Sequence, residues 1–152
     1  MTHLKKGDKA PAIEAKDQNG NLISLSDLTG KKVILYFYPK DSTPGCTAEA
    51  CDLRDNYSEL RNMGFEILGV SPDSEASHKK FISKNSLPFT LISDTDKKVV
   101  TDYGVWGEKK MYGRVYEGVY RTTFIISKQG IIEHVITKVN TKDHTQQILD
   151  LL

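Results

Sequence analysis

The sequence has few of the features that would place it in a membrane, on nucleic acid or outside the cell. No run approaches the roughly 20 apolar residues of a membrane-spanning helix, and the start of the chain has no apolar core of signal-peptide length. Lys and Arg total 21 against 20 Asp and Glu, so a net charge of +1 provides no broad field for phosphate backbones or anionic lipid. We expect a cytoplasmic protein with no nucleic-acid or membrane partner.

Cysteine is also scarce, since Cys46 and Cys51 are the only two in 152 residues. Cytoplasmic disulfides are usually transient and catalytic or redox-sensing, so this pair does not suit a structural crosslink. The chain has no zinc-finger spacing and no phosphate-binding glycine loop of the Walker or dinucleotide type. We expect its histidines on the surface or in strands: His3, His78, His134 and His144.

What is present fits one globular domain spanning residues 1–152, with 38% hydrophobic and 27% charged residues. Strand and helix patterns alternate along the chain. Strands or extended segments are predicted at 33–38, 65–71 and 88–92, helices at 43–62, 74–84, 97–103 and 141–152, hairpins at 10–28 and 122–136, and a loop or irregular hairpin at 105–117. This order predicts an α/β domain with a thioredoxin-like, mixed central sheet flanked by helices and an N-terminal β-hairpin.

Residues that carry chemistry concentrate where the strand at 33–38 ends and a helix begins, a favoured place for an active site in α/β proteins. Thr43 is a good N-cap residue and Pro44 suits the first helical position, so Cys46 is expected in the first turn. The unpaired backbone N–H groups there favour an anion, and the thiolate is the reactive form of cysteine. Cys46 is therefore the candidate nucleophile.

A nearby cation would favour the thiolate further, and Arg121 is the candidate. It starts the predicted strand at 121–124, from which a planar guanidinium could reach both the sulfur and an incoming oxygen. An isolated arginine is usually a solvated surface charge. The residues alone therefore leave both interpretations of Arg121 open.

The spacing of the two cysteines bears on whether they can pair. In an intact helix, positions 46 and 51 would have Cα atoms roughly 8.7 Å apart and on different sides. A disulfide needs a Cα separation of about 4.4 to 6.8 Å. If Cys46 and Cys51 pair, the first turns of the helix must unwind.

The segment Thr43-Pro44-Gly45-Cys46-Thr47-Ala48-Glu49-Ala50-Cys51, preceded by Tyr36-Phe37-Tyr38-Pro39, resembles the peroxiredoxin family. It is most similar to the bacterioferritin comigratory protein, or peroxiredoxin Q, branch. The resemblance extends from Gly7-Asp8-Lys9-Ala10-Pro11 to Arg121-Thr122-Thr123-Phe124. It therefore covers most of the chain.

The resemblance implies a thiol-dependent peroxidase in which Cys46 is the peroxidatic and Cys51 the resolving cysteine, with Pro39, Thr43 and Arg121 completing the site. It implies hydrogen peroxide and organic hydroperoxides as substrates, thioredoxin or a similar dithiol as reductant, no metal or organic cofactor, and a monomer. The alternative is a thioredoxin-like redox-sensing or binding module. The Pro39, Thr43 and Arg121 set favours turnover, because a sensor needs no dedicated positioning of peroxide.

Overall fold

The structure, a computed structural model, describes all 152 residues around a five-stranded mixed sheet of order β5-β4-β3-β8-β9. β3 pairs in parallel with β4, and β4 with β5, whereas β3 and β8, and β8 and β9, are antiparallel. The central strand is the apolar run predicted at 33–38. The strands are β3 (Lys32–Phe37), β4 (Phe65–Ser71), β5 (Thr90–Ser93), β8 (Thr122–Ile126) and β9 (Ile132–Ile136).

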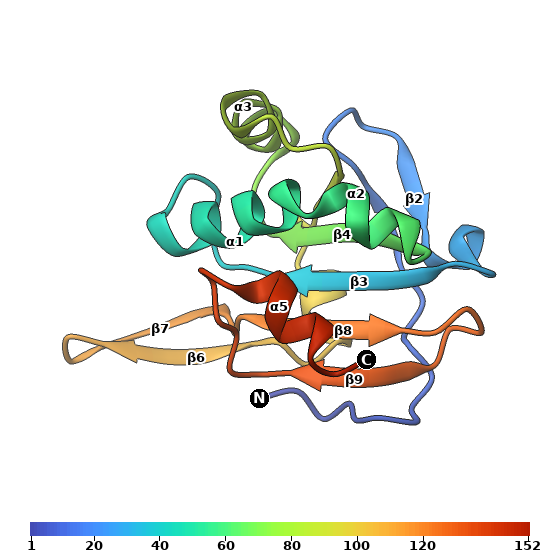
Figure 1. Ribbon diagram of the computed structural model, residues 1–152. Helices are drawn as coiled ribbons and strands as arrows, with labels where there is room; N and C mark the ends of the chain where they lie inside the picture. Colours follow the sequence, from blue (N-terminus) through green and yellow to red (C-terminus); the bar gives the residue numbers. More distant parts are fainter.

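Helices make both parallel connections, as a crossover between parallel strands requires. Figure 1 shows α1, α2 and α5 lying over one face of the sheet, with α3 beyond its upper edge. No helix combines the length and apolar character needed to cross a bilayer. The helices are α1 (Pro44–Asp55) and α2 (Tyr57–Asn62) after β3, α3 (Glu75–Asn85) after β4, α4 (Lys98–Asp102) after β5, and the closing helix α5 (His144–Leu149).

Successive residues of β3 point alternately into two apolar cores, one on each face of the sheet. Val33, Leu35 and Phe37 belong to a cluster of 16 buried residues that includes side chains of α4. Ile34 and Tyr36 belong to a second cluster of 16, to which α1, α2, α3 and α5 contribute. Because both faces are covered, β3 is apolar from Val33 to Phe37 rather than alternating.

Two hairpins lie outside the main sheet. β1 (Glu14–Lys16) pairs with β2 (Leu22–Ser24), confirming the predicted N-terminal hairpin with shorter strands, and η1 (Leu25–Leu28) follows it. β6 (Trp106–Met111) and β7 (Arg114–Val119) form a ribbon that extends from the body in Figure 1. Its pairing is regular from end to end, so the expected irregularity is wrong. Tyr112 and Gly113 both have positive φ (52° and 76°), which a tight two-residue hairpin turn requires.

The predicted helix at 43–62 is divided in the structure. Asn56 leaves helical geometry (φ −111°, ψ 12°) and separates α1 from α2. Its side-chain amide donates a hydrogen bond of 2.9 Å to the Asp52 carbonyl, one of the local bonds by which Asn competes with a helix. The closing helix is also shorter than predicted, because residues 141–143 form a turn before α5.

Candidate active site

The start of α1 presents free backbone donors. Thr43 occupies the N-cap position (φ −88°, ψ 154°), Pro44 begins the helix and Cys46 lies in its first turn, as the sequence predicted. The Thr43 hydroxyl caps no helix N–H group; it donates a 2.8 Å hydrogen bond to the Lys40 carbonyl. The N–H groups of Gly45 and Cys46 consequently donate to no protein acceptor and remain available to an oxygen ligand.

The structure brings Arg121 to Cys46 across 75 positions of sequence. Arg121 Nη2 lies 3.3 Å from Cys46 Sγ. The contact follows from the sheet: β8 pairs antiparallel with β3, so the residue before Thr122 lies beside the end of β3, where the chain turns toward α1. Cys46 is 1% exposed, whereas the Arg121 side chain is 23% exposed.

Gly45 allows the guanidinium to approach the helix. A Cβ at this position would lie 3.2 Å from Arg121 Nη2, closer than side chains normally tolerate. The glycine of the Thr43–Cys46 segment therefore has a packing role as well as leaving the first turn of α1 easy to unwind.

Glu49 is a site residue that the sequence did not single out. It lies three positions after Cys46 on the same face of α1, is fully buried, and accepts a 2.7 Å hydrogen bond from Arg121 Nη1 through Oε1. The two arms of the Arg121 guanidinium thus hold the Cys46 sulfur and a carboxylate at once. The only available sequence signal was its helical spacing from Cys46, because a glutamate in a helix is usually solvated.

Burial and charge act against each other on this pair. Burial raises the pKa of Glu49 from 4.5 to about 7, although the Arg121 guanidinium opposes the rise. Burial alone would lower the pKa of Arg121, but the Glu49 carboxylate and Cys46 together raise it above its ordinary value. Arg121 therefore stays charged while Glu49 titrates close to neutral pH.

His144 lies close to Glu49 and is fully buried in α5, neither on the surface nor in a strand as expected for the histidines. Its Nδ1 lies 2.9 Å from Gln147 Oε1, which only accepts, so Nδ1 carries a proton. Burial lowers the pKa of His144, so the ring is neutral and Nε2 accepts a 2.8 Å hydrogen bond from the Thr123 hydroxyl. Glu49 Oε2 is 3.6 Å from Nε2 and has no hydrogen-bond partner.

We predict that Glu49→Gln makes the protein more stable at pH 8. Because the folded-state pKa of Glu49 is raised, its contribution to stability is full below about 4.5 and is lost as the pH rises through about 7. The neutral amide removes that loss, and the free energy of unfolding at pH 8 should rise by about 1 to 3 kcal/mol. Urea denaturation between pH 4 and 8 measures it, with the exposed Glu59→Gln as control. Equal pH dependence in wild type and Glu49→Gln would contradict the prediction.

Cys51 is half-buried on a different side of α1 from Cys46. Its Sγ donates to Asn85 Oδ1, the last residue of α3, across 3.7 Å, and both cysteines are free thiols. Pro39 is half-buried two residues beyond the end of β3. The helix α1 is continuous from Pro44 to Asp55, so the structure holds the two thiols apart in an intact helix.

The site has no deep cavity. The largest hollow, about 390 Å³, lies between the N-terminal hairpin and the Asp94–Asp96 turn. Neither Cys46 nor Arg121 lines any of the five cavities. A nearly buried sulfur without a pocket favours a substrate whose reacting end is small.

A reduced cysteine at a helix start, in contact with a guanidinium and placed at the end of a central strand, defines a thiol enzyme. Residues 6–135 match the AhpC/TSA family. The chain is 49% identical over 152 residues to the putative peroxiredoxin Bcp of Haemophilus influenzae, covering 100% of this chain and 98% of that protein. It is 45% identical to peroxiredoxin Bcp of Escherichia coli over 100% and 97% of the two chains.

The fold shows the same relationship. Peroxiredoxin Q of Xanthomonas campestris superposes with a TM-score of 0.85 at 37% identity, covering 91% of this chain and 87% of that one. The chain therefore belongs to the AhpC/TSA family, in the branch of the Bcp and Q peroxiredoxins, and it is a thiol peroxidase. The thioredoxin-like fold predicted from the order of its strands is confirmed.

Proposed function

We propose that the protein reduces hydrogen peroxide and small organic hydroperoxides with Cys46 as the peroxidatic nucleophile. The observation that carries this proposal is the 3.3 Å contact of Cys46 Sγ with Arg121 at the start of α1. A guanidinium and free helix N–H groups stabilise negative charge on sulfur, and the thiolate is the form that attacks.

In the first step, the Cys46 thiolate attacks the terminal OH oxygen of the peroxide and the O–O bond breaks. The leaving alkoxide or hydroxide takes up from solvent a proton equivalent to the one that the thiol released on ionising, and leaves as alcohol or water. Arg121 and the backbone N–H groups of α1 stabilise the negative charge that develops as this bond lengthens. The Thr43 hydroxyl orients the peroxide, and Pro39 shields the sulfur from water. Cys46 becomes a sulfenic acid.

In the second step, the Cys51 thiol condenses with the Cys46 sulfenic acid, giving a disulfide and water. In intact α1 the two Cα atoms would be roughly 8.7 Å apart, beyond the range of about 4.4 to 6.8 Å that a disulfide spans. The helix must therefore unwind locally. The one hydrogen bond that the Cys51 sulfur makes is a weak thiol contact with Asn85. This contact offers little resistance to the movement of Cys51.

In the third step, a dithiol protein reduces the disulfide by thiol–disulfide exchange and restores both cysteines. We propose thioredoxin or a similar dithiol as this reductant. The protein is then an atypical 2-Cys peroxiredoxin, because both cysteines of the catalytic disulfide lie in one chain.

We predict that Cys51→Ser completes one peroxide turnover and then stalls. Cys46 still forms the sulfenic acid, but no internal thiol can condense with it, so excess peroxide carries it on to the sulfinic acid. Mass spectrometry after one equivalent of peroxide should find a dimedone-reactive sulfenic acid in the variant and a disulfide in the wild type. Steady-state turnover with thioredoxin, thioredoxin reductase and NADPH should fall at least about tenfold.

Sustained wild-type turnover by Cys51→Ser with this reducing system would contradict the resolving role of Cys51 while leaving that of Cys46 intact. A wild-type protein that consumes peroxide with a small dithiol but not with thioredoxin would contradict the proposed reductant alone.

A further inference from the structure

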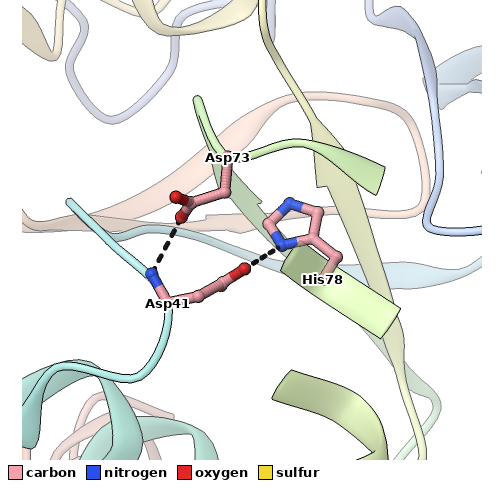
Figure 2. Close-up of side chains that lie close together, drawn as sticks. All are labelled: Asp41, Asp73 and His78. Atoms are coloured by element: carbon pink, nitrogen blue, oxygen red, sulfur yellow. Dashed lines mark hydrogen bonds and ion pairs between the residues drawn. The ribbon is translucent and has the colours of Figure 1, made fainter. Parts of the chain in front are cut away.

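A second buried polar cluster, centred on Asp41, lies beneath the turn that leads into α1. The Asp41 side chain is 3% exposed and contacts three partners. Its Oδ1 accepts a 2.7 Å hydrogen bond from the Tyr38 hydroxyl, and Oδ2 accepts one of 2.8 Å from Ser77. His78 Nδ1 lies 2.7 Å from Oδ2. Figure 2 shows this contact as a dashed line.

His78 is fully buried in α3, whereas the sequence led us to expect it on the surface or in a strand, and both of its ring nitrogens are engaged. Nε2 lies 3.0 Å from the Ile92 carbonyl oxygen, which only accepts, so Nε2 carries a proton. The short contact between Nδ1 and Asp41 Oδ2 requires a second proton between them. Asp41 and His78 therefore share a proton as a closed pair rather than as two independent side chains.

The same residues do not form an open cation site. Ligand atoms of Asp41, Asp73 and His78 lie within 4.8 Å of one another. Asp73 Oδ2, however, already accepts hydrogen bonds from the Asp41 backbone N–H (2.8 Å; Figure 2) and the Ser71 hydroxyl (2.7 Å). The cluster thus satisfies itself, and what it holds is the backbone and side chain of Asp41.

The position of Asp41 in the chain connects this cluster to the reacting sulfur. Asp41 comes two residues before Thr43 and five before Cys46. Between Asp41 and Thr43, Ser42 has φ 62°, a left-handed conformation that a non-glycine residue adopts only when its surroundings enforce it. The anchored Asp41 on one side and the Thr43 hydroxyl bound to Lys40 on the other supply that enforcement.

We propose that the buried Asp41–His78 pair is a positioning unit of the peroxidase site, anchoring the turn 40–43 to α3. The anchor sets where the Thr43 hydroxyl and the free N–H groups of α1 stand relative to Arg121. It acts on the placement of the peroxide and not on the chemistry of the sulfur itself. This inference rests on the proposed role of Cys46.

Two substitutions at Asp41 distinguish the effect of its buried hydrogen bonds from the effect of its carboxylate charge. Asp41→Ala leaves His78 Nδ1 and the Tyr38 and Ser77 hydroxyls without their buried partner. Asp41→Asn keeps the shape: its amide can donate to Nδ1 of a neutral His78 protonated on Nε2, while its carbonyl oxygen accepts from Tyr38. The conservative variant should therefore restore most of what the alanine loses.

The test compares two reactions of Cys46 under single-turnover conditions, one with hydrogen peroxide and one with iodoacetamide. Iodoacetamide needs a thiolate but no positioned oxygens. In Asp41→Ala the rate constant for peroxide should fall at least about tenfold, because misplacement near the chemistry is costly, while alkylation keeps its rate or accelerates. In Asp41→Asn the rate constant for peroxide should be within about threefold of the wild-type value. The exposed Asp27→Ala serves as the control.

A wild-type rate with peroxide in Asp41→Ala, or an equal fall in both reactions, would overturn the positioning role. If Asp41→Ala does not fold, the double variant Asp41→Ala/His78→Leu removes both halves of the pair and leaves neither unpaired. Its peroxide rate should still fall at least about tenfold, and a wild-type rate would overturn the proposal. Failure of wild-type Cys46 to react with peroxide would instead contradict the proposed function.

Discussion

Cys46→Ser is expected to abolish peroxide consumption. A serine hydroxyl is not ionised near neutral pH. The Arg121 guanidinium and the backbone N–H groups at position 46 stabilise an anion but do not remove a proton, and the Glu49 carboxylate is already bound by Arg121 Nη1. The second-order rate constant with hydrogen peroxide should fall at least about a thousandfold, so that peroxide is lost no faster than in buffer without protein. A peroxide electrode or a ferrous oxidation assay measures it directly.

The substitution is well suited to this test because it changes little else. Serine replaces sulfur with a smaller oxygen at a position 1% exposed, and the backbone of the first turn of α1 is unaltered. Thermal unfolding and circular dichroism should show a folded protein. The matched control is Cys51→Ser, which keeps the first turnover. Peroxide consumption at the wild-type rate by Cys46→Ser, or its loss in both variants, would refute the assignment of Cys46.

The elements that the sequence predicted correctly are those set by local patterns. The run at 33–38 had to be covered on both faces, and the turn around Gly20 (φ 79°) had to form a hairpin. Thr43 and Pro44 marked the start of α1 because N-cap and first-turn preferences depend on nearby residues alone. These local signals placed Cys46 at a helix start before any tertiary contact was known.

What the sequence did not predict depends on partners far away in the chain. Two histidines expected on the surface or in strands are fully buried in helices, since His78 contacts Asp41 across 37 positions and His144 contacts Thr123 across 21. No local pattern distinguishes a buried, partnered histidine from a solvated one. The β6–β7 segment was predicted only as a loop or irregular hairpin, because Tyr112 adopts a positive φ that β-turn preferences assign to Gly, Asn or Asp.

The residues of the candidate site also fall into those that local signals predict and those that depend on distant contacts. Cys46 follows from local helix signals, whereas Arg121 was open on the residues alone and was favoured only by resemblance to a family. Its position became clear with the pairing of β3 and β8, which is non-local. Glu49 was missed because its role depends on Arg121 reaching it. A buried glutamate becomes recognisable only when the cation that compensates it has been placed.

Substitution of Arg121 is expected to have the second largest effect, through both of its arms. Arg121→Lys keeps one positive charge but loses the fork, so a single ammonium cannot hold Cys46 Sγ and Glu49 Oε1 in the geometry of the two Nη groups. The rate constant for peroxide should fall roughly 100-fold, as when one donor to a developing negative charge is removed. In Arg121→Met, which removes the charge, the rate constant for peroxide should fall further.

Stability and rate respond differently to loss of Arg121, and this difference tests its role. Arg121→Met leaves the fully buried Glu49 without its cation, and the free energy of unfolding at pH 8 should fall by about 1 to 3 kcal/mol. The double variant Arg121→Met/Glu49→Gln removes the stranded carboxylate and should recover that loss. It should not recover the peroxide rate, because the sulfur still lacks its guanidinium. Urea denaturation and stopped-flow single turnovers provide the two readouts. Recovery of the rate together with stability would show that Arg121 acts only by supporting the fold and has no part in stabilising the transition state.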